Sequence, residues 1–521
     1  LSIRRQRQMC IRDRAKTDVA NCTASKTKAE LLAVAMERRI LIAPIADLRE
    51  VLNSAQLAAR GYFDDLHIGD QKILAPGAFA QVSPTSLTPL PQVSKLGADT
   101  EEILANNHYS VSKTPKTKIS RKPLDGVKVV DFTWSLAGPY ATRVLADLGA
   151  TVVKIESNKK PDAARGFLPI WDNIPGSEQS AMFDSANAGK LSLSLDLSKP
   201  EAISVVHDLV GWADLVSESF SPKVMAGWGL GYEQLAKINP RIIMVSTCLN
   251  GQYGPLASFA GYGNLGAAIS GFYGLAGWPD RPPAGPFGAY TDYTSTHFLV
   301  ATILAALDQQ RRTEVGAYID LAQAEAAQHF ISPALLDMSA NDHLVGRSGN
   351  NDDAMVPHGG FRCEGDDNWI AIAVVDDDAW RELCRVIERP DLEAKVKLKS
   401  LGGRNTARAL IEGELTKWTQ SQSIDDAESK LIAAGIAAHR VQSSEGCLAD
   451  PQLAHRNAFL WVDHPNRRSI IENSRFKMSH SECKPTTRAP FVGEHTFDIL
   501  ADILNYDGDR IADLAAAEVL E

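Results

Sequence analysis

The stretch GVKVVDFTWSLAGPYATRVLADLGATVVKIES, which starts at Gly126, constrains the fold of this chain more tightly than any other. Apolar, β-branched runs at 127–132 and 151–156 flank a segment with helical spacing at 140–148. Pro139 suits the first turn of that helix, and a glycine follows its last residue. Strand, helix and strand in this order predict a βαβ unit and therefore a parallel sheet.

The loop at 133–138 precedes the predicted helix. In such units this loop binds phosphate-bearing ligands, because free backbone N–H groups and the helix dipole favour anions. A dinucleotide enzyme is one interpretation, since Glu156 follows about 20 residues later, where a ribose-binding acid belongs. The loop, however, offers Ala137, Gly138 and Pro139 in place of G-x-G-x-x-G, which weighs against NAD and leaves a dehydrogenase as a distant alternative.

Size and composition narrow the class of protein further. A chain of 521 residues suggests two to four domains, and its net charge of −10 argues against nucleic-acid or anionic-membrane binding. The longest apolar run, near 298–307, is about half of the roughly 18 residues that a membrane helix needs. The seven cysteines form no C-x-x-C pair, which indicates reduced thiols and a cytoplasmic location.

An internal repeat with a long period organises the chain. QLAARGYF starts at Gln56 and QLAHRNAF at Gln452, while KLGADTEEIL starts at Lys95 and FVGEHTFDIL at Phe491. Both pairs are 396 residues apart (452 − 56 and 491 − 95), about the size of an enzyme subunit. We therefore interpret the chain as part of a tandem of two modules that has lost most of the first.

The segments outside the second module have distinct compositions. Residues 27–107 are interpreted as the C-terminal remnant of the first module, and 108–121 as a solvated basic linker. Residues 1–26 begin with LSIRRQRQMCIRDR, which has five arginines in fourteen residues and no apolar middle. We interpret 1–26 as non-native or disordered, and the chain as a fragment.

An ordered series of motifs follows the βαβ unit. It includes SANAGKLSLSLDLSKPEA from Ser185, ADLVSESFSPKVMAGWGLGYEQLAKINPRIIMVS from Ala213, GAYTDYTSTHFLVATILAAL from Gly288 and RRTEVGAYIDLAQAEA, which ends at Ala326. In order and spacing this series resembles the class III CoA-transferases, the family of the formyl-CoA, carnitine and bile-acid CoA-transferases. The resemblance spans about 122–505.

The resemblance implies an α/β fold with a Rossmann-like, doubly wound CoA-binding domain and a smaller inserted α+β domain. We expect the large domain at 122–314, the small domain at 315–420, a return to the large domain at 421–505 and a tail at 506–521. Within 315–420, NWIAIAVV is strand-like and DAWRELCRVI helix-like. Family members form interlocked dimers, so a homodimer, or an intrachain pseudo-dimer in a full tandem, is implied.

Asp292 is the candidate nucleophile. It is the only charge before a long apolar run, where the residues alone favour a helix N-cap. The resemblance places the family's nucleophilic aspartate here, which would attack an acyl-CoA thioester and carry the reaction through a covalent aspartyl intermediate. The family's flanking glycines are Thr291 and Thr296 in this chain, which could narrow the acyl pocket or mark an inactive module.

The family's CoA contacts map onto several loops by position. Two arginines usual in the family are Ser157 and Gly227 here, so Lys159, Lys160, Lys199 or Lys223 could bind phosphate in their place. The implied CoA-binding residues are Trp134, Ser135, Leu136, Ala137, Ser157, Leu195, Asp196, Leu197, Ser198, Ser219, Phe220, Ser221 and Lys223.

Alternatives remain on the same fold. Acyl-CoA racemases carry a histidine where this chain has Tyr262, and a tyrosine is a poor base near neutral pH, so transfer is favoured. A non-catalytic CoA-ester-binding scaffold also stays open. His358, His439 and His464 have no spaced partners, so no metal is expected.

The substrates implied are an acyl-CoA and a carboxylic acid acceptor. The run 349–361 lacks the series of glycines with which formyl-CoA enzymes close their site, which argues against oxalate. An aromatic lining is expected to accept a larger acyl group; its members are Phe272, Tyr273, Trp278 and Tyr290.

Overall fold

The computed structural model describes residues 3–87, 93–106, 122–173, 176 and 178–521, and side chains from residue 13 onward. The chain divides into two units. The larger comprises residues 1–274, 285–345 and 458–521, and the smaller comprises 275–284 and 346–457. Each unit is described by itself.

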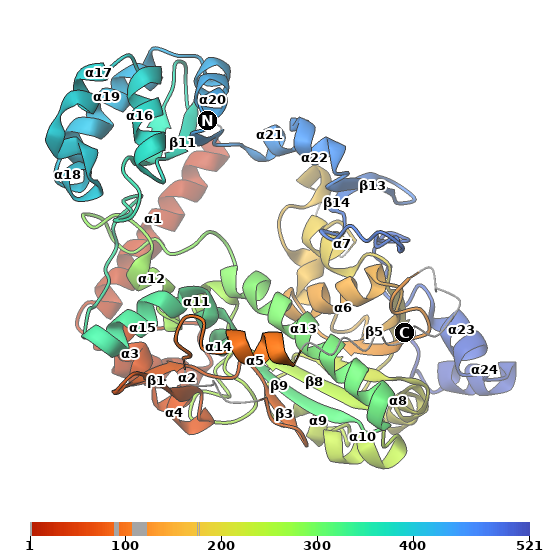
Figure 1. Ribbon diagram of the computed structural model, residues 1–521. Helices are drawn as coiled ribbons and strands as arrows, with labels where there is room; N and C mark the ends of the chain where they lie inside the picture. Colours follow the sequence, from red (N-terminus) through yellow and green to blue (C-terminus); the bar gives the residue numbers. More distant parts are fainter. Residues whose placement is uncertain (1–2, 88–92, 107–121, 174–175, 177) are drawn as a thin grey trace. The chain divides into compact units, whose positions relative to one another are not determined.

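A seven-stranded sheet forms the centre of the larger unit, in the order β3-β9-β8-β7-β4-β5-β6. Figure 1 labels β3, β9, β8 and β5 of this sheet. All neighbours are parallel except β3 and β9, which are antiparallel. The strands are β3 (Gln81–Ser83), β4 (Lys128–Phe132), β5 (Thr151–Glu156), β6 (Leu191–Ser194), β7 (Leu215–Glu218), β8 (Ile243–Cys248) and β9 (Ala317–Ala322).

Helices cover both faces of this sheet. Val130 and Phe132 of β4 pack in one buried cluster with α8 (Pro200–Trp212) and α10 (Tyr232–Ile238). Val129, on the other face, packs in a second cluster with α6 (Ala137–Asp147) and α13 (Tyr290–Thr313). The fold is therefore the doubly wound α/β arrangement expected from the sequence.

The predicted βαβ unit is confirmed as β4, α6 and β5. The chain runs from β4 to β5 and β6 in one direction, then returns to β7 on the other side of β4. The strand order therefore reverses between β4 and β7. Ligands of open parallel sheets bind beyond the carboxyl ends of the strands at such a point.

The smaller unit contains a three-stranded antiparallel sheet of β10 (His358–Arg362), β11 (Trp369–Ala373) and β12 (Ala437–Arg440). The expected strand and helix are present as β11 and α16 (Asp377–Val386). Trp380, Leu383 and Leu415 are fully buried in its core, with α19 (Arg408–Gln420) and α20 (Ile424–Ala433) around them.

The boundaries of this unit differ from the expected 315–420. The segment 317–322 is β9, whose apolar residues pair along β8 inside the large sheet, so the large unit extends to residue 345. At the other end, α20 and β12 complete the small sheet and its core, so the return to the large unit begins at residue 458. A continuous apolar strand does not reveal from sequence alone which sheet it joins.

The two repeated segments form matching elements. Adding 396 to the first residue of each N-terminal element gives the start of its C-terminal counterpart to within one residue. The pairs are α2 (Lys28–Arg38) and α20, α3 (Leu48–Leu52) and α21 (Ser444–Ala449), α4 (Ala55–Arg60) and α22 (Pro451–His455), β1 (Phe63–Ile68) and β13 (Phe459–Asp463), and β2 (Gln71–Pro76) and β14 (Arg468–Glu472).

Residues 3–23 form one helix, α1, in the segment 1–26 that was expected to be non-native or disordered. The linker expected at 108–121 lies outside the described residues. The remaining α-helices are α5 (Thr100–Ala105), α7 (Ala181–Asn187), α9 (Val224–Gly227), α11 (Gly263–Ile269), α12 (Phe272–Leu275), α14 (Gln323–Gln328), α15 (Ser332–Asn341), α17 (Pro390–Ala394), α18 (Leu401–Thr406), α23 (Thr496–Asp498) and α24 (Gly508–Ala516).

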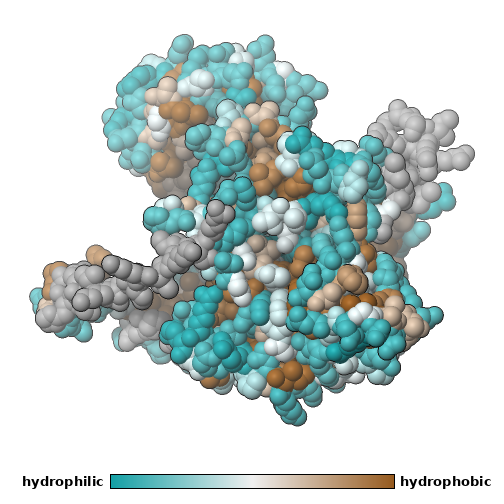
Figure 2. Space-filling view, turned by 90° about the vertical axis from the view of Figure 1, so that its right-hand side faces the viewer, coloured by the Kyte–Doolittle hydropathy of each residue, from teal (hydrophilic) through white to brown (hydrophobic). Residues whose placement is uncertain are grey.

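Hydrophilic residues predominate on the face shown in Figure 2, where hydrophobic residues form small, separate groups. None of the helices in the described part of the chain is both long and apolar enough to cross a membrane.

Candidate active site

A cavity of about 310 Å³ lies at the point where the strand order reverses. Its walls come from the segments after β4 and β7, the end of β8 and the loop beyond it. The lining residues are Leu41, Trp134, Ser135, Leu136, Ala137, Gly138, Ser219, Phe220, Ser221, Thr247, Cys248, Leu249, Ala257, Phe259, Ala260, Gly261, Tyr262, Asp292 and Gln323.

Asp292 is the only carboxylate among these lining residues. It lies in the first turn of α13 and is 4% exposed. The N–H of Gly263, the first residue of α11, donates to Asp292 Oδ2 (3.2 Å). The N-cap of α13 is Ala289, so Asp292 does not cap its own helix.

Burial raises the pKa of Asp292 to about 7, and the hydrogen bond from Gly263 opposes this shift. The cause is the loss of hydration, which penalises the charged form. Near neutral pH, the carboxylate and the carboxylic acid therefore both exist in appreciable amounts. Catalytic groups commonly have pKa values moved toward neutrality in this way.

Thr291 and Thr296, which stand where the family has its flanking glycines, do not line this cavity. Thr291 donates to the carbonyl of Gly263 (3.1 Å), and Thr296 donates to the carbonyls of Asp292 (2.7 Å) and Ala137 (3.0 Å). Their hydroxyl groups are thus bonded to backbone that surrounds the site. A Cβ at Gly263 would lie 2.5 Å from the carbonyl oxygen of Ala289, so this close packing requires glycine.

The loop from Trp134 to Gly138 is held by side chains from the segments that follow β5 and β7. Ser135 has a φ of +65°, and its N–H donates to Asp162 Oδ1 (2.9 Å). Asp162 in turn pairs with the buried Lys154 (3.0 Å). Trp134 N–H donates to Ser219 Oγ (2.8 Å), which joins the loops after β4 and β7. Ala137 and Gly138, the first two residues of α6, line the same cavity as Asp292.

Some of the expected CoA-binding residues line this cavity and others do not. Residues 134–137 and 219–221 are all in the lining. Ser157, the segment 195–198 and Lys223 are not. Ser157 Oγ donates to Glu521 (2.6 Å), and Lys159 pairs with Asp196 (2.8 Å) and holds the pKa of that half-buried carboxyl at about 2.

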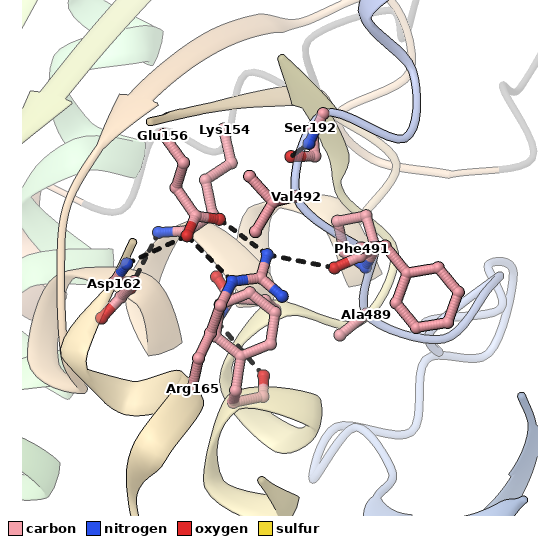
Figure 3. A network of polar contacts seen from close by, with 12 residues as sticks. Lys154, Glu156, Asp162, Arg165, Ser192, Ala489, Phe491 and Val492 are labelled. Carbon is pink, nitrogen blue, oxygen red and sulfur yellow. Dashed lines mark hydrogen bonds and ion pairs between the residues drawn. The ribbon is translucent and has the colours of Figure 1, made fainter. Parts of the chain in front are cut away.

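Glu156, the candidate ribose acid of the dinucleotide interpretation, is bonded within the protein. Arg165 donates to both of its oxygens (2.9 and 2.8 Å), and the N–H of Asp162 donates to it as well (3.1 Å) (Figure 3). Glu156 is 3% exposed. These contacts satisfy the carboxylate, which speaks further against the dehydrogenase.

The other candidates also have places in the structure. Tyr262 lines the cavity and is 39% exposed, and no histidine occurs among the described lining residues. Cys248 is the one thiol in the lining, and burial raises its pKa to about 12. Within the described ranges, no group of three or more metal-ligating side chains gathers.

The four aromatic residues expected around the acyl group are not in the lining. Phe272 and Tyr290 pack edge to face (5.2 Å between centroids) in a small core cluster, with Tyr273 beside it. Trp278 belongs to the smaller unit. The expectation that these four residues line the acyl pocket is therefore wrong for this cavity.

A second cavity, of about 360 Å³, lies against other faces of α6 and α13 and the segment 472–476. It has mainly apolar walls, and neither Asp292 nor the loops after β4 and β7 reach it. The cavity of about 310 Å³ that contains Asp292 is therefore the candidate active site, although the other cavity is larger.

The contacts that the N-terminal segment makes at the site could not be predicted from the sequence around Asp292. Leu41 lines the cavity, and Arg60 of α4 pairs with Asp320 (2.7 Å) and Glu325. The 396-residue repeat indicated that 27–107 is the C-terminal remnant of a first module, but it did not indicate which residues this remnant contacts.

Comparisons with known proteins agree with this geometry. The model of CoA-transferase family III matches residues 2–100 and 124–496. The succinyl-CoA:glutarate CoA-transferase of Mus musculus is 30% identical over 417 residues, which cover 77% of this chain and 91% of that protein. The probable CoA-transferase Rv1866 of Mycobacterium tuberculosis is 27% identical over 522 residues, 96% of this chain and 63% of that protein.

A CAIB/BAIF family protein from Brucella suis has a similar solved structure, with a TM-score of 0.68 and 29% identity; the match covers 74% of this chain and all of that chain. The family model covers most of the chain. The chain therefore belongs to CoA-transferase family III and is a CoA-transferase.

Proposed function

We propose that the protein transfers CoA from an acyl-CoA thioester to a carboxylic acid through a covalent intermediate on Asp292. One observation carries this proposal: Asp292 is the only carboxylate in the lining of the cavity at the strand-order reversal, and burial raises its pKa to about 7. A buried carboxylate with few hydrogen bonds is poorly solvated and so is a better nucleophile than one in water.

The proposed reaction exchanges acyl bonds without net oxidation. An oxygen of Asp292 attacks the thioester carbon, the C–S bond breaks, and CoA thiolate leaves a mixed anhydride. The thiolate then attacks the Asp292 acyl carbon, which releases the donor carboxylate and gives an aspartyl-CoA thioester. The acceptor carboxylate attacks the acyl carbon of that thioester, which expels CoA thiolate and gives a second mixed anhydride. The thiolate finally attacks the acceptor acyl carbon of this anhydride, which releases the acceptor as its CoA thioester and frees the Asp292 carboxylate.

Two groups of backbone amides support these steps. Ala137 and Gly138 at the start of α6 line the cavity, and the N–H of Gly263 at the start of α11 already bonds to Asp292. Negative charge develops on a carbonyl oxygen in each attack, and preorganised N–H groups at helix starts stabilise it. We assign CoA binding to 134–137 and 219–221, and Ser157, the segment 195–198 and Lys223 remain predicted contacts.

We propose short dicarboxylic acids as substrates. By their names, relatives with 27–30% identity act on succinyl-CoA together with glutarate, D-citramalate or L-malate. An acetyl-CoA:oxalate CoA-transferase of Acetobacter aceti is 32% identical over 343 residues, so oxalate belongs in the same panel.

We further propose that residues 27–107 replace a partner module at this site, as expected for one half of a tandem or of a dimer. The matching element bounds support this idea. We also propose a cytoplasmic location, because the six cysteines in the described side-chain range are all free thiols.

The covalent step is tested by mass spectrometry of the protein incubated with succinyl-CoA and then with hydroxylamine, which traps activated carboxylates. We expect a CoA adduct or hydroxamate at Asp292 that Asp292→Ala lacks, with a loss of transfer of at least about a thousandfold. Asp308→Ala is the matched control, because Asp308 lies on the same helix and is exposed.

The other outcomes separate the alternatives. Succinyl-CoA binding without modification, together with exchange of the α-proton for deuterium, would favour a racemase. Binding with neither modification nor exchange would favour a scaffold. An adduct that persists in Asp292→Ala would place the nucleophile elsewhere.

A further inference from the structure

Two side chains of α4, Gln56 and Arg60, are buried against the rest of the larger unit, with exposed fractions of 4% and 3%. Gln56 Nε2 donates to the carbonyls of Asn250 (2.8 Å) and Tyr253 (2.9 Å), and Gln56 Oε1 accepts from the N–H of Leu256 (2.7 Å). One side chain thus holds three points of the loop that follows β8.

Arg60 holds the same loop through an acidic pair. Its guanidinium bonds to Asp320 (2.7 Å) and to Glu325, and lies over the ring of Tyr253 (4.6 Å to the centroid). The oxygens of Asp320 also accept from the N–H of Gln252 (both 3.1 Å). Arg60 therefore connects the loop to the end of β9 and to α14.

The loop is shaped for these two side chains. Gly251 has a φ of +78° and Gly254 a φ of +104°, conformations that other residues rarely adopt. A Cβ at Gly251 would meet the guanidinium of Arg60, and one at Gly254 would meet the amide of Gln56 at 2.5 Å. Both glycines thus permit a close approach from a segment almost 200 residues away in sequence.

This loop leads directly into the wall of the candidate active site. Leu249 begins the segment, and Ala257 and Phe259 follow it; all three line the cavity with Asp292. Leu249 and Phe259 pack in one cluster with Ala35 of the N-terminal segment. The position of this wall therefore depends on contacts with that segment.

We propose that Gln56 and Arg60 are positioning residues that fix the loop 249–257, and with it one wall of the acyl-CoA cavity. This inference rests on the proposed function of that cavity. Neither residue is among those that line it. They act through the loop, so their loss should change the geometry of the site and leave Asp292 itself unaltered.

The repeat supplies a control within the same chain. Gln452 and Arg456 occupy the equivalent positions on and beside α22, in the same QLAxR pattern, and both are exposed. A substitution there makes the same chemical change in the same local sequence but without buried partners.

The test compares Gln56→Ala and Arg60→Met with Gln452→Ala and Arg456→Met in the full chain. Amide hydrogen exchange over 249–257 should accelerate at least about tenfold in the first pair and stay unchanged in the second. Alkylation of Cys248, which lines the cavity, should accelerate in parallel. If Arg60→Met does not fold, the milder Gln56→Ala, which removes three hydrogen bonds, still decides.

Steady-state transfer kinetics provide a second readout. KM for succinyl-CoA should rise in Gln56→Ala and Arg60→Met, while the Asp292 adduct still forms at saturation. Arg60→Lys should recover only part of the loss, because an ammonium cannot fork between Asp320 and Glu325. Unchanged exchange over 249–257 in both Gln56→Ala and Arg60→Met would overturn the inference. This readout needs no turnover, so it stands apart from failure of the Asp292 chemistry, which Asp292→Ala reports separately.

Discussion

At the residue scale, the proposed role of Asp292 depends on how little water, hydrogen bonding and positive charge its carboxylate meets. Asp292 is 4% exposed, its carboxylate accepts one hydrogen bond from the described residues, that of Gly263, and no cation contributes to its pKa shift. The charged form is therefore poorly stabilised, which a nucleophile requires and which an ordinary surface aspartate avoids.

The pH dependence of transfer should follow the ionisation of this group. Because the carboxylate attacks and the acid does not, kcat/KM should fall tenfold per pH unit below an inflection near 7. The substrate carboxylates titrate near pH 4, so they do not produce this inflection. Rates measured from pH 5 to 9 check the prediction, and an inflection near 4 would contradict it.

The same pKa shift makes a prediction about stability. The folded-state pKa of Asp292 is raised from 3.8 to about 7. Its ionisation therefore costs no stability below pH 3.8, and the free energy of unfolding falls as pH rises from 3.8 through 7. Asp292→Asn removes this cost, so the variant should be more stable than the parent protein at pH 8, by up to about 4 kcal/mol.

Denaturant unfolding of both proteins at pH 8 and pH 4 measures this difference. It should nearly vanish at pH 4, where Asp292 is neutral in the folded state. Glu218 and Glu325, whose pKa values are also raised to about 7 by burial, titrate in both proteins and so cancel in the comparison. The same difference at both pH values would exclude the ionisation of Asp292 as its cause.

At the scale of elements, the sequence pattern predicted those strands, loops and helices whose conformation depends on neighbouring residues in the chain. The strand, loop and helix around 127–148 follow from apolar runs, Pro139 and a terminal glycine. The candidate nucleophile and the loops after β4 and β7 followed from motif order. The partners of Gln56 and Arg60 could not be predicted, because they lie about 194 to 265 residues away and their pairing leaves no periodic signal.

The buried charges at the end of β5 are a second feature that the sequence pattern did not reveal. Arg165 is 1% exposed, bonds to both oxygens of Glu156 and lies 3.7 Å from the ring centroid of Phe183. Arg165→Met keeps most of the apolar contact but removes the cation that bonds to both oxygens of the buried Glu156. We expect a loss of about 3–5 kcal/mol of stability, measured by denaturant unfolding.

Two further variants bracket this result. Replacing Glu156 by Leu in the Arg165→Met background should restore much of the loss, because the unpaired charge is then absent. Arg312→Met removes an exposed pair with Asp308 and should cost less than about 1 kcal/mol. Equal losses for Arg165→Met and Arg312→Met would show that the buried pair has no special weight.

At the scale of the whole molecule, one sequence pattern occurs in two environments. In α3 and α4, Leu48, Val51, Gln56, Leu57 and Arg60 are buried. None of the residues of α21 and α22 is buried. Between α4 and α22 the QLAxR pattern is the same, so the contrast there comes from what each copy packs against. At α3 and α21 the sequences differ, with Ser444 and Cys447 in place of Leu48 and Val51.

This contrast predicts a difference in local stability between the two copies. Amides of 444–456 should exchange at least about tenfold faster than those of 48–60 in the monomeric chain, because exposed helices without buried contacts open more readily. Hydrogen exchange read by mass spectrometry, on a sample whose mass is checked by light scattering, measures both segments in one protein.

The Arg60→Met variant makes this comparison decisive. Exchange in 48–60 should rise toward that of 444–456 when the buried anchor is lost, whereas Arg456→Met should leave 444–456 unchanged. Should the second copy become protected in a dimer and only there, it docks on a partner as the first copy docks within this chain. Equal protection of both copies in the monomer would mean that burial of α4 adds nothing to its stability, and the positioning role of Arg60 would then lose its basis.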